Sequence, residues 1–111
     1  MARKKKADLL QGTLDLLILR VLGREPLHGW AVSRRIRQIS EGALEVNQGS
    51  LYPALHRLRD RGLVRSAWEI SEDERNVKVY ELTQAGRKVL EEEEAGWRRF
   101  SAAVEQILDN A

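Results

Sequence analysis

The chain has 111 residues, of which 42% are apolar and 32% charged, and its formal net charge at pH 7 is +2. This length predicts one small domain, and the lack of cysteine excludes disulfides and thiolate zinc sites. No apolar run approaches the roughly 18 residues that span a membrane, and the basic start lacks the apolar region of a secretion signal. We therefore expect a cytoplasmic protein without a membrane partner.

The charge is unevenly divided along the chain. Residues 1–65 carry 13 Lys or Arg against 6 Asp or Glu, a balance of +7, whereas residues 66–111 carry 6 against 11, a balance of −5. A basic first half favours one face that meets a polyanion, and a chance distribution over a solvated surface is the alternative. The basic run at 3–6 fits either an arm that contacts phosphates or a solvated terminus.

Apolar residues at helical spacing predict a first helix over 11–22 and a second over 28–40. The expected core face of the second helix consists of Val32, Ile36 and Ile39. A short strand is expected over 43–46, before the next helix begins.

A third helix is predicted over 49–61, with Ser50 able to cap its start. Pro53 then falls in the first turn, where a proline costs little. At roughly 100° per residue, the inward stripe consists of Leu51, Leu55 and Leu58. The outward side presents small groups, an imidazole and guanidinium groups, as a helix that enters the major groove of DNA requires.

Two β-rich runs, 63–70 and 77–83, flank the polar turn 71–76 and predict a hairpin. Thr83 is a good N-cap for a long last helix that reaches about Leu108. The expected fold is therefore mainly α with a small β-hairpin.

The order of these elements predicts a winged helix-turn-helix followed by a C-terminal dimerisation helix. The winged-helix domain is expected over 1–83, with a basic arm over 1–8, and the dimerisation helix over 84–111.

Four segments resemble successive parts of the PadR family of bacterial transcription regulators: LLQGTLDLLILRVL, LHGWAVSRRIRQIS, GSLYPALHRLRDRGLV and VYELTQAGRKVL. The resemblance implies that the third helix enters the major groove, that the wing touches flanking DNA, and that the last helix dimerises with help from the first. The single last helix is similar to that of the short-chain branch of the family.

The candidate DNA-binding residues are Gln48, Ser50, Tyr52, His56 and Arg57 in the third helix, Trp30 and Arg34 in the second, and Arg75 and Lys78 in the hairpin. Tyr52 has the alternative of a half-buried packing role, and Trp30, which stands where many relatives have tyrosine, has the same alternative. The turn between the strands contains Glu72, Asp73 and Glu74, which would repel phosphate and weigh against a contact by the wing.

The last helix carries large apolar residues close to a coiled-coil spacing. The candidate dimer-interface residues are Leu14, Ile18, Leu90, Trp97, Phe100, Val104, Ile107 and Leu108. In some members of the resembled family, planar aromatic compounds bind between the subunits near this helix, so Trp97 is a candidate for stacking an aromatic effector. A plain packing role for Trp97 is the alternative.

The leading hypothesis is a homodimeric repressor that binds an inverted-repeat operator in double-stranded DNA, with a small aromatic effector as a further partner. The alternative is a winged-helix module that binds another protein and not DNA. An enzyme is not expected, because the chain shows no nucleophile–base set and no phosphate-binding glycine loop. No cofactor or metal is expected either, since the chain has only two histidines and no thiols.

Overall fold

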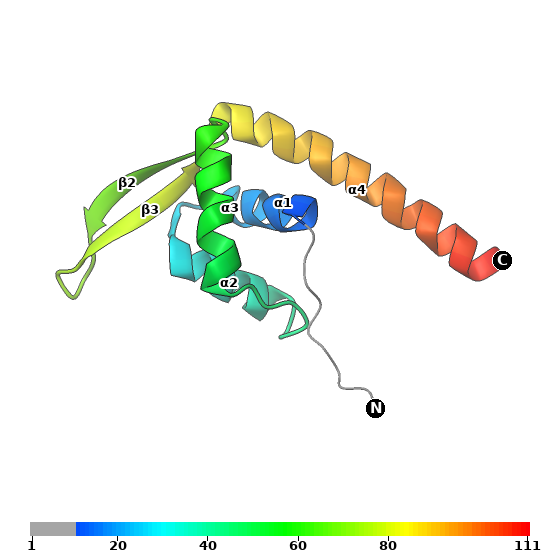
Figure 1. The fold of residues 1–111 in the computed structure, drawn as a ribbon, viewed down its shortest axis with the longest axis horizontal. Coiled ribbons are helices and arrows are strands. Elements are labelled where there is room, and N and C mark those ends of the chain that lie inside the picture. The colour runs from blue at the N-terminus through cyan, green and yellow to red at the C-terminus, as the bar shows by residue number, and fades with distance from the viewer. Residues whose placement is uncertain (1–10) are drawn as a thin grey trace.

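The computed structural model describes residues 11–111, which form four helices and one three-stranded sheet (Figure 1). The elements are α1 (Gln11–Leu22), β1 (Leu27–His28), α2 (Gly29–Ile39), α3 (Gln48–Asp60), β2 (Val64–Ile70), β3 (Asn76–Leu82) and α4 (Gln84–Asn110). The fold is therefore mainly α with a small hairpin, as the sequence predicts. The basic run at 3–6 and the rest of the predicted arm over 1–8 lie outside the described residues.

The core lies where α1 packs against α2, α3 and α4. Its fully buried side chains are mostly leucines at helical spacing, together with one tyrosine from the sheet: Ile18, Leu19, Leu22, Val32, Leu51, Leu55, Leu58, Val64 and Tyr80. The predicted inward stripe of the third helix is confirmed in full. Ile39, which was expected in the core, is 69% exposed because it is the last residue of α2, beyond the layer of side chains that α1 and α3 cover.

The sheet has the strand order β1-β3-β2, and both of its pairs are antiparallel. The hairpin of β2 and β3 is confirmed, but the strand expected over 43–46 is wrong. That segment follows a turn in which Glu41 and Gly42 have positive φ. The backbone of Leu44 forms hydrogen bonds with the Ser40 hydroxyl and not with a neighbouring strand. The short strand is β1, which pairs with the other edge of β3.

The third helix starts one residue earlier than predicted, and its N-cap is Asn47, not Ser50. The Asn47 side chain accepts a hydrogen bond from the Ser50 backbone N–H at 2.9 Å. Pro53 is therefore the sixth residue of α3 and lies past its first turn. Having no N–H, it cannot donate to the carbonyl of Gly49 four residues earlier, and both residues are exposed.

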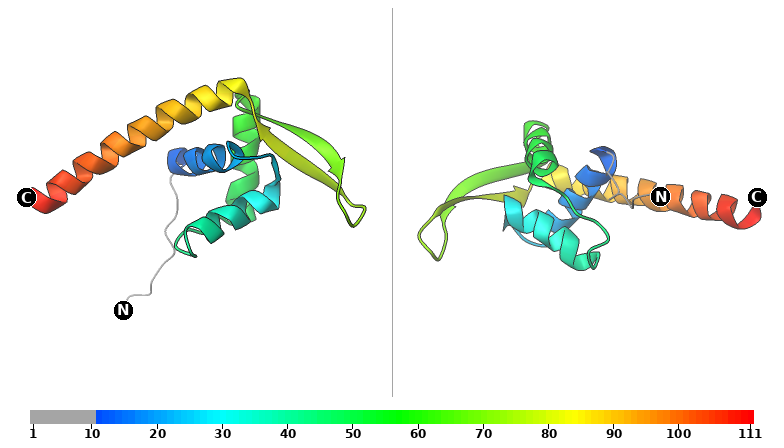
Figure 2. Two further views of the ribbon diagram at one scale, coloured as in Figure 1. Left: turned by 180° about the vertical axis from the view of Figure 1, so that it is seen from behind. Right: turned by 60° about the horizontal axis from the view of Figure 1, so that its bottom comes forward.

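The last helix begins where Thr83 links it to the end of α3. Its Oγ1 accepts from the Gly86 N–H at 3.0 Å, which confirms the predicted N-cap, and it donates to the Gly62 carbonyl at 2.7 Å. From this anchor α4 runs for 27 residues, and its C-terminal half leaves the body of the molecule. The hairpin projects on the opposite side, as the views in Figure 2 show.

Candidate nucleic-acid interface

The N-terminal half of α3 presents a polar surface on a rigid support. Gln48, Ser50 and His56 are exposed, while Leu51 and Leu55 on the other face are fully buried. The Asn47 side chain accepts from the N–H of Ser50, and Gln48 and Gly49, whose N–H groups precede it, are exposed residues. A helix start with free N–H groups and small polar side chains suits contact with phosphates and base edges.

Tyr52 positions α3 against the start of α2. It is half-buried and packs against the core. A Cβ at Gly29 would lie 2.6 Å from Tyr52 Cε1 and 2.8 Å from its hydroxyl oxygen, so only glycine fits beneath the ring. Of the two roles considered for Tyr52, packing is the one that this contact supports.

The Tyr52 ring also lies near the sheet, where Tyr80 is buried. Burial, and then the neighbouring Tyr52, raise the pKa of Tyr80. The two rings thus join α2, α3 and β3 at one place.

A DNA contact would require Arg57 to project from α3 into solvent. Its side chain instead turns toward α1. Its Nη2 donates a 2.8 Å hydrogen bond to Asp15 Oδ1 on α1, and the pair is partly buried. The Nε atom of Arg57 is also buried and has no hydrogen-bond partner among residues 11–111. Arg57 therefore joins α3 to α1 through Asp15, while 35% of its side chain remains exposed.

The first turn of α2 lies beside α3 and carries Trp30 and Arg34. The N-cap residue His28 makes no side-chain hydrogen bond to this turn. Trp30 is exposed and stacks on His28 with ring centroids 5.6 Å apart, and the Arg34 guanidinium lies 5.8 Å from the Trp30 ring centroid. Uncapped N–H groups, an indole donor and an exposed guanidinium together form a surface that favours anions.

The turn between β2 and β3 is acidic, as the sequence indicates. Ser71 Oγ donates to Asp73 Oδ1 at 2.7 Å, and this bond lowers the pKa of Asp73, so the carboxylate stays charged. Arg75 lies 3.9 Å from the other oxygen of Asp73, so its charge is partly neutralised there. Lys78 lies further back, with its Nζ 5.5 Å from the ring centroid of Trp68.

The second half of α4 carries an uncovered apolar stripe. Its members are Trp97, Phe100, Val104, Ile107 and Leu108, with exposed fractions from 36% for Val104 to 72% for Leu108. By contrast, Leu14, Ile18 and Leu90, which were expected in the same interface, are buried inside this chain. These three assignments are corrected, because all three side chains belong to the core of this chain.

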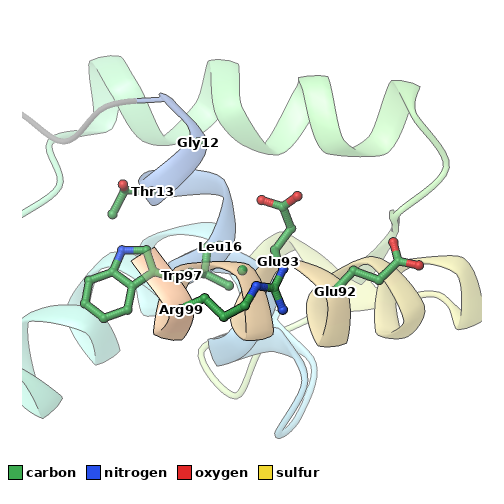
Figure 3. A pocket seen from close by; sticks show the side chains of 8 residues that line it. Gly12, Thr13, Leu16, Glu92, Glu93, Trp97 and Arg99 are labelled. Carbon is green, nitrogen blue, oxygen red and sulfur yellow. The ribbon is translucent and has the colours of Figure 1, made fainter. Parts of the chain in front are cut away.

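Two hollows meet at Trp97, between α1 and α4. One, of about 350 Å³, is lined mainly by Leu16, Leu17, Leu44 and Trp97. The other, of about 480 Å³, adds Glu92, Glu93 and Arg99, and Figure 3 shows Trp97 and Leu16 on its wall. On the neighbouring turn, the hydrogen bond from Arg98 lowers the pKa of Glu94. Trp97 is thus placed where a flat apolar molecule could stack.

The sequence did not single out three residues that shape this surface. Gly29 is required by the Tyr52 ring, and Asn47 caps α3, where an asparagine directly before a helix was a usable signal. Trp68 lies in the run 63–70 that predicts a strand, but its 67% exposure depends on how far the hairpin extends past the core.

Within residues 11–111, no group of His, Asp and Glu side chains is arranged to hold a metal ion. Over the same residues, none of the helices has the length and apolar character that crossing a bilayer requires.

Comparison with known proteins shows which family this chain resembles. The model of the Transcriptional regulator PadR-like family matches residues 18–92. The transcriptional regulator Rv3488 of Mycobacterium tuberculosis is 40% identical over 87 residues, which are 78% of this chain and 77% of that protein. The transcriptional regulator YqjI of Escherichia coli is 33% identical over 81 residues, and the match spans 73% of this chain but only 37% of YqjI.

A solved structure agrees with these matches. The PadR family transcriptional regulator from Eggerthella lenta superposes with a TM-score of 0.76 at 32% identity, covering 91% of this chain and 86% of that one. The family model covers well over half of the chain, and both the sequence and the fold agree with it. The chain is therefore a transcription regulator, not an enzyme, and belongs to the PadR family.

Proposed function

We propose that this regulator is a homodimeric repressor that binds an inverted-repeat operator, with one α3 in each of two successive major grooves. The observation that carries the proposal is the division of α3 into two faces. Its apolar face is fully buried in its own chain, and its exposed face presents Gln48, Ser50 and His56 near the helix start. A groove-binding helix needs such a rigidly held polar face.

The flanking contacts come from neighbouring elements. Trp30 and Arg34 at the start of α2 would bind a backbone phosphate, and Lys78 would do so from the hairpin. Tyr52 and Arg57 would act indirectly, by holding α3 against α2 and α1. Arg75 contributes little in this scheme because it lies beside Asp73.

The dimer would form through residues 84–111, and residues 1–83 would bind DNA. Soluble monomers rarely leave an apolar stripe like that of α4 in water. A second copy of α4 is the natural cover, since Trp97 and Val104 are seven residues apart, the repeat of a coiled coil. A two-fold axis between the copies would set the two α3 helices about 34–36 Å apart, one turn of DNA.

Repression would follow from blocking the promoter, and a small aromatic effector would relieve it. The hollow between α1 and α4 offers Trp97 as a stacking surface beside the dimer helix. A ligand there lowers DNA affinity only if it binds more tightly to a dimer whose α3 helices are wrongly spaced.

Selection from random duplex DNA at two salt concentrations tests the proposal. We expect an inverted repeat with half-site centres about 10 base pairs apart, and an affinity that falls steeply with salt. Light scattering should report a dimer under the same conditions. Selection without any sequence preference at either salt would contradict the proposal and favour the protein-binding alternative, for which the acidic turn between β2 and β3 is the supporting feature.

A further inference from the structure

Two contacts besides the leucine stripe hold helix α3 on the rest of the molecule. Near the start of α3, the Tyr52 ring lies against Gly29 of α2. Further along, Arg57 donates from Nη2 to Oδ1 of Asp15, where α3 crosses α1 and packs on it (Figure 1). The second contact is an ion pair, so it affects the charge that α3 presents as well as the position of the helix.

The geometry of this ion pair is not that of a strong structural salt bridge. One hydrogen bond of 2.8 Å joins the two side chains, and the buried Nε atom of Arg57 has no hydrogen-bond partner within the described part of the chain. A guanidinium that binds a carboxylate tightly usually makes two parallel hydrogen bonds. Since burial of an incompletely bonded charge is costly, stability alone does not account for the pair.

Arg57 lies on the side of α3 that presents polar groups. At about 100° per residue, it falls within about 20° of Ser50 around the helix axis, two turns further along. Its side chain is 35% exposed, whereas that of Asp15 is only 13% exposed. An unpaired guanidinium at this place would bind backbone phosphates of any sequence, and the Asp15 carboxylate opposes this by holding and neutralising it.

We propose that Asp15 is a positioning residue for DNA specificity, which holds Arg57 against α1 and keeps its guanidinium from binding backbone phosphates of any sequence. The inference rests on the proposed function, since it assumes that the exposed face of α3 meets DNA. Base contacts discriminate between sequences, whereas each added phosphate contact strengthens binding to every sequence. An α3 whose Arg57 is neutralised therefore discriminates better than one whose Arg57 is free.

The test compares Asp15→Asn with the unaltered protein on two duplexes, the selected operator and an unrelated sequence of the same length. Asparagine can still accept the hydrogen bond from Arg57 but no longer neutralises its charge. The variant should bind the unrelated duplex about fivefold more tightly, and its plot of log affinity against log salt should steepen by about 0.9. Affinity for the operator should rise less, because the base contacts already fix α3 there. The ratio of the two affinities should therefore fall.

A double-mutant cycle separates this role from the plain loss of a negative charge. Removal of any carboxylate near DNA strengthens binding, but that gain does not depend on Arg57. In the Arg57→Gln background, Asp15→Asn should leave the affinity for the unrelated duplex unchanged. Asp15→Glu keeps the charge and should retain most of the discrimination. Thermal denaturation reports the stability of each variant, which a merely structural role would lower together with both affinities.

Three outcomes would overturn the inference and leave the proposed function standing. One is an unchanged affinity of Asp15→Asn for the unrelated duplex while the operator is still selected. Another is weaker binding of the unrelated duplex by Arg57→Gln alone, which would show that Arg57 contacts phosphates despite Asp15. The third is a gain from Asp15→Asn that persists in the Arg57→Gln background. If the unaltered protein prefers no sequence at all, the proposed function fails first, and this inference fails with it.

Discussion

Helix α3 carries a stripe of leucines, and helix α4 carries a stripe of aromatic and aliphatic residues. The two stripes differ in how much of their surface is buried within the chain. In α3 the stripe is fully buried, because Leu51, Leu55 and Leu58 have no exposed surface. In α4 only the first turns are covered, where Leu90 is buried, while Phe100 further along is 67% exposed. One helix has all its apolar contacts within the chain, and the other has more apolar surface than its own chain can cover.

This difference separates the two kinds of partner. An amphipathic helix with a satisfied apolar face offers only its polar side, which suits a charged and hydrated ligand such as DNA. A helix that keeps an apolar stripe in water suits another apolar surface. Substitutions on the two stripes should therefore differ in whether their effect depends on protein concentration.

The largest effect is expected for Leu58→Ala in α3. Truncating this fully buried side chain should lower the free energy of unfolding by about 3 kcal/mol. Chemical denaturation at several protein concentrations should give the same loss each time. Ile107→Ala in α4 is the counterpart, and its effect should grow at concentrations where the dimer is populated. Equal, concentration-independent losses for both variants would mean that the α4 stripe is covered within its own chain.

The next effect is expected for Phe100→Glu. A charge in the centre of the α4 stripe should raise the dissociation constant of the dimer by about 30-fold or more, because a central aromatic side chain typically contributes about 2 kcal/mol to an interface. Analytical ultracentrifugation gives this constant directly. Ala102→Glu is the matched control, since residue 102 is exposed on the opposite side of the same helix and its charge should be tolerated. Dissociation by both variants alike would place the interface elsewhere.

A smaller effect is expected for Gly29→Ala, which tests the contact between the start of α2 and the Tyr52 ring on α3. The new methyl group would fall 2.6 Å from the Tyr52 ring, and such overpacking should cost about 2 kcal/mol in the free energy of unfolding. In the Tyr52→Ala background the same substitution should cost little, because the ring is gone. The comparison of the two costs by thermal or chemical denaturation isolates this contact. An unchanged cost in both backgrounds would assign the effect to the backbone of α2 instead.

Much of the fold, including which side of α3 faces the core, was predictable from the spacing of apolar residues alone. Apolar residues three and four apart identified the four helices and the inward side of α3, and alternation with a polar turn identified the hairpin. Spacing within a helix does not reveal which other element covers it. For this reason Leu14, Ile18 and Leu90 were assigned to a partner although they are buried in the core of this chain.

The candidate site was less predictable, because its geometry depends on contacts between distant residues. Arg57 and Asp15 are 42 residues apart, and nothing in either segment indicates the ion pair that holds Arg57 against α1. Strand β1 is only two residues long and exists because β3 offers it a free edge. By contrast, the acidic turn and the N-cap at Thr83 depend on adjacent residues, and the sequence identified both.

The smallest effects are expected at the N-termini of α3 and α4. A side-chain oxygen caps each helix, but only the cap of α4 makes a second hydrogen bond. Asn47→Ala should cost about 1 kcal/mol in the free energy of unfolding, since it removes one acceptor for the Ser50 N–H. Thr83→Ala should cost more, because the Thr83 hydroxyl also donates to the Gly62 carbonyl and so ties α4 to the end of α3. Asn47→Asp and Thr83→Ser keep the capping oxygen and should keep most of the stability. If Asn47→Ala proved the costlier of the two, the start of α3 would be held mainly by its cap, and the contact between Tyr52 and Gly29 would contribute less to the placement of the DNA-facing residues than the structure indicates.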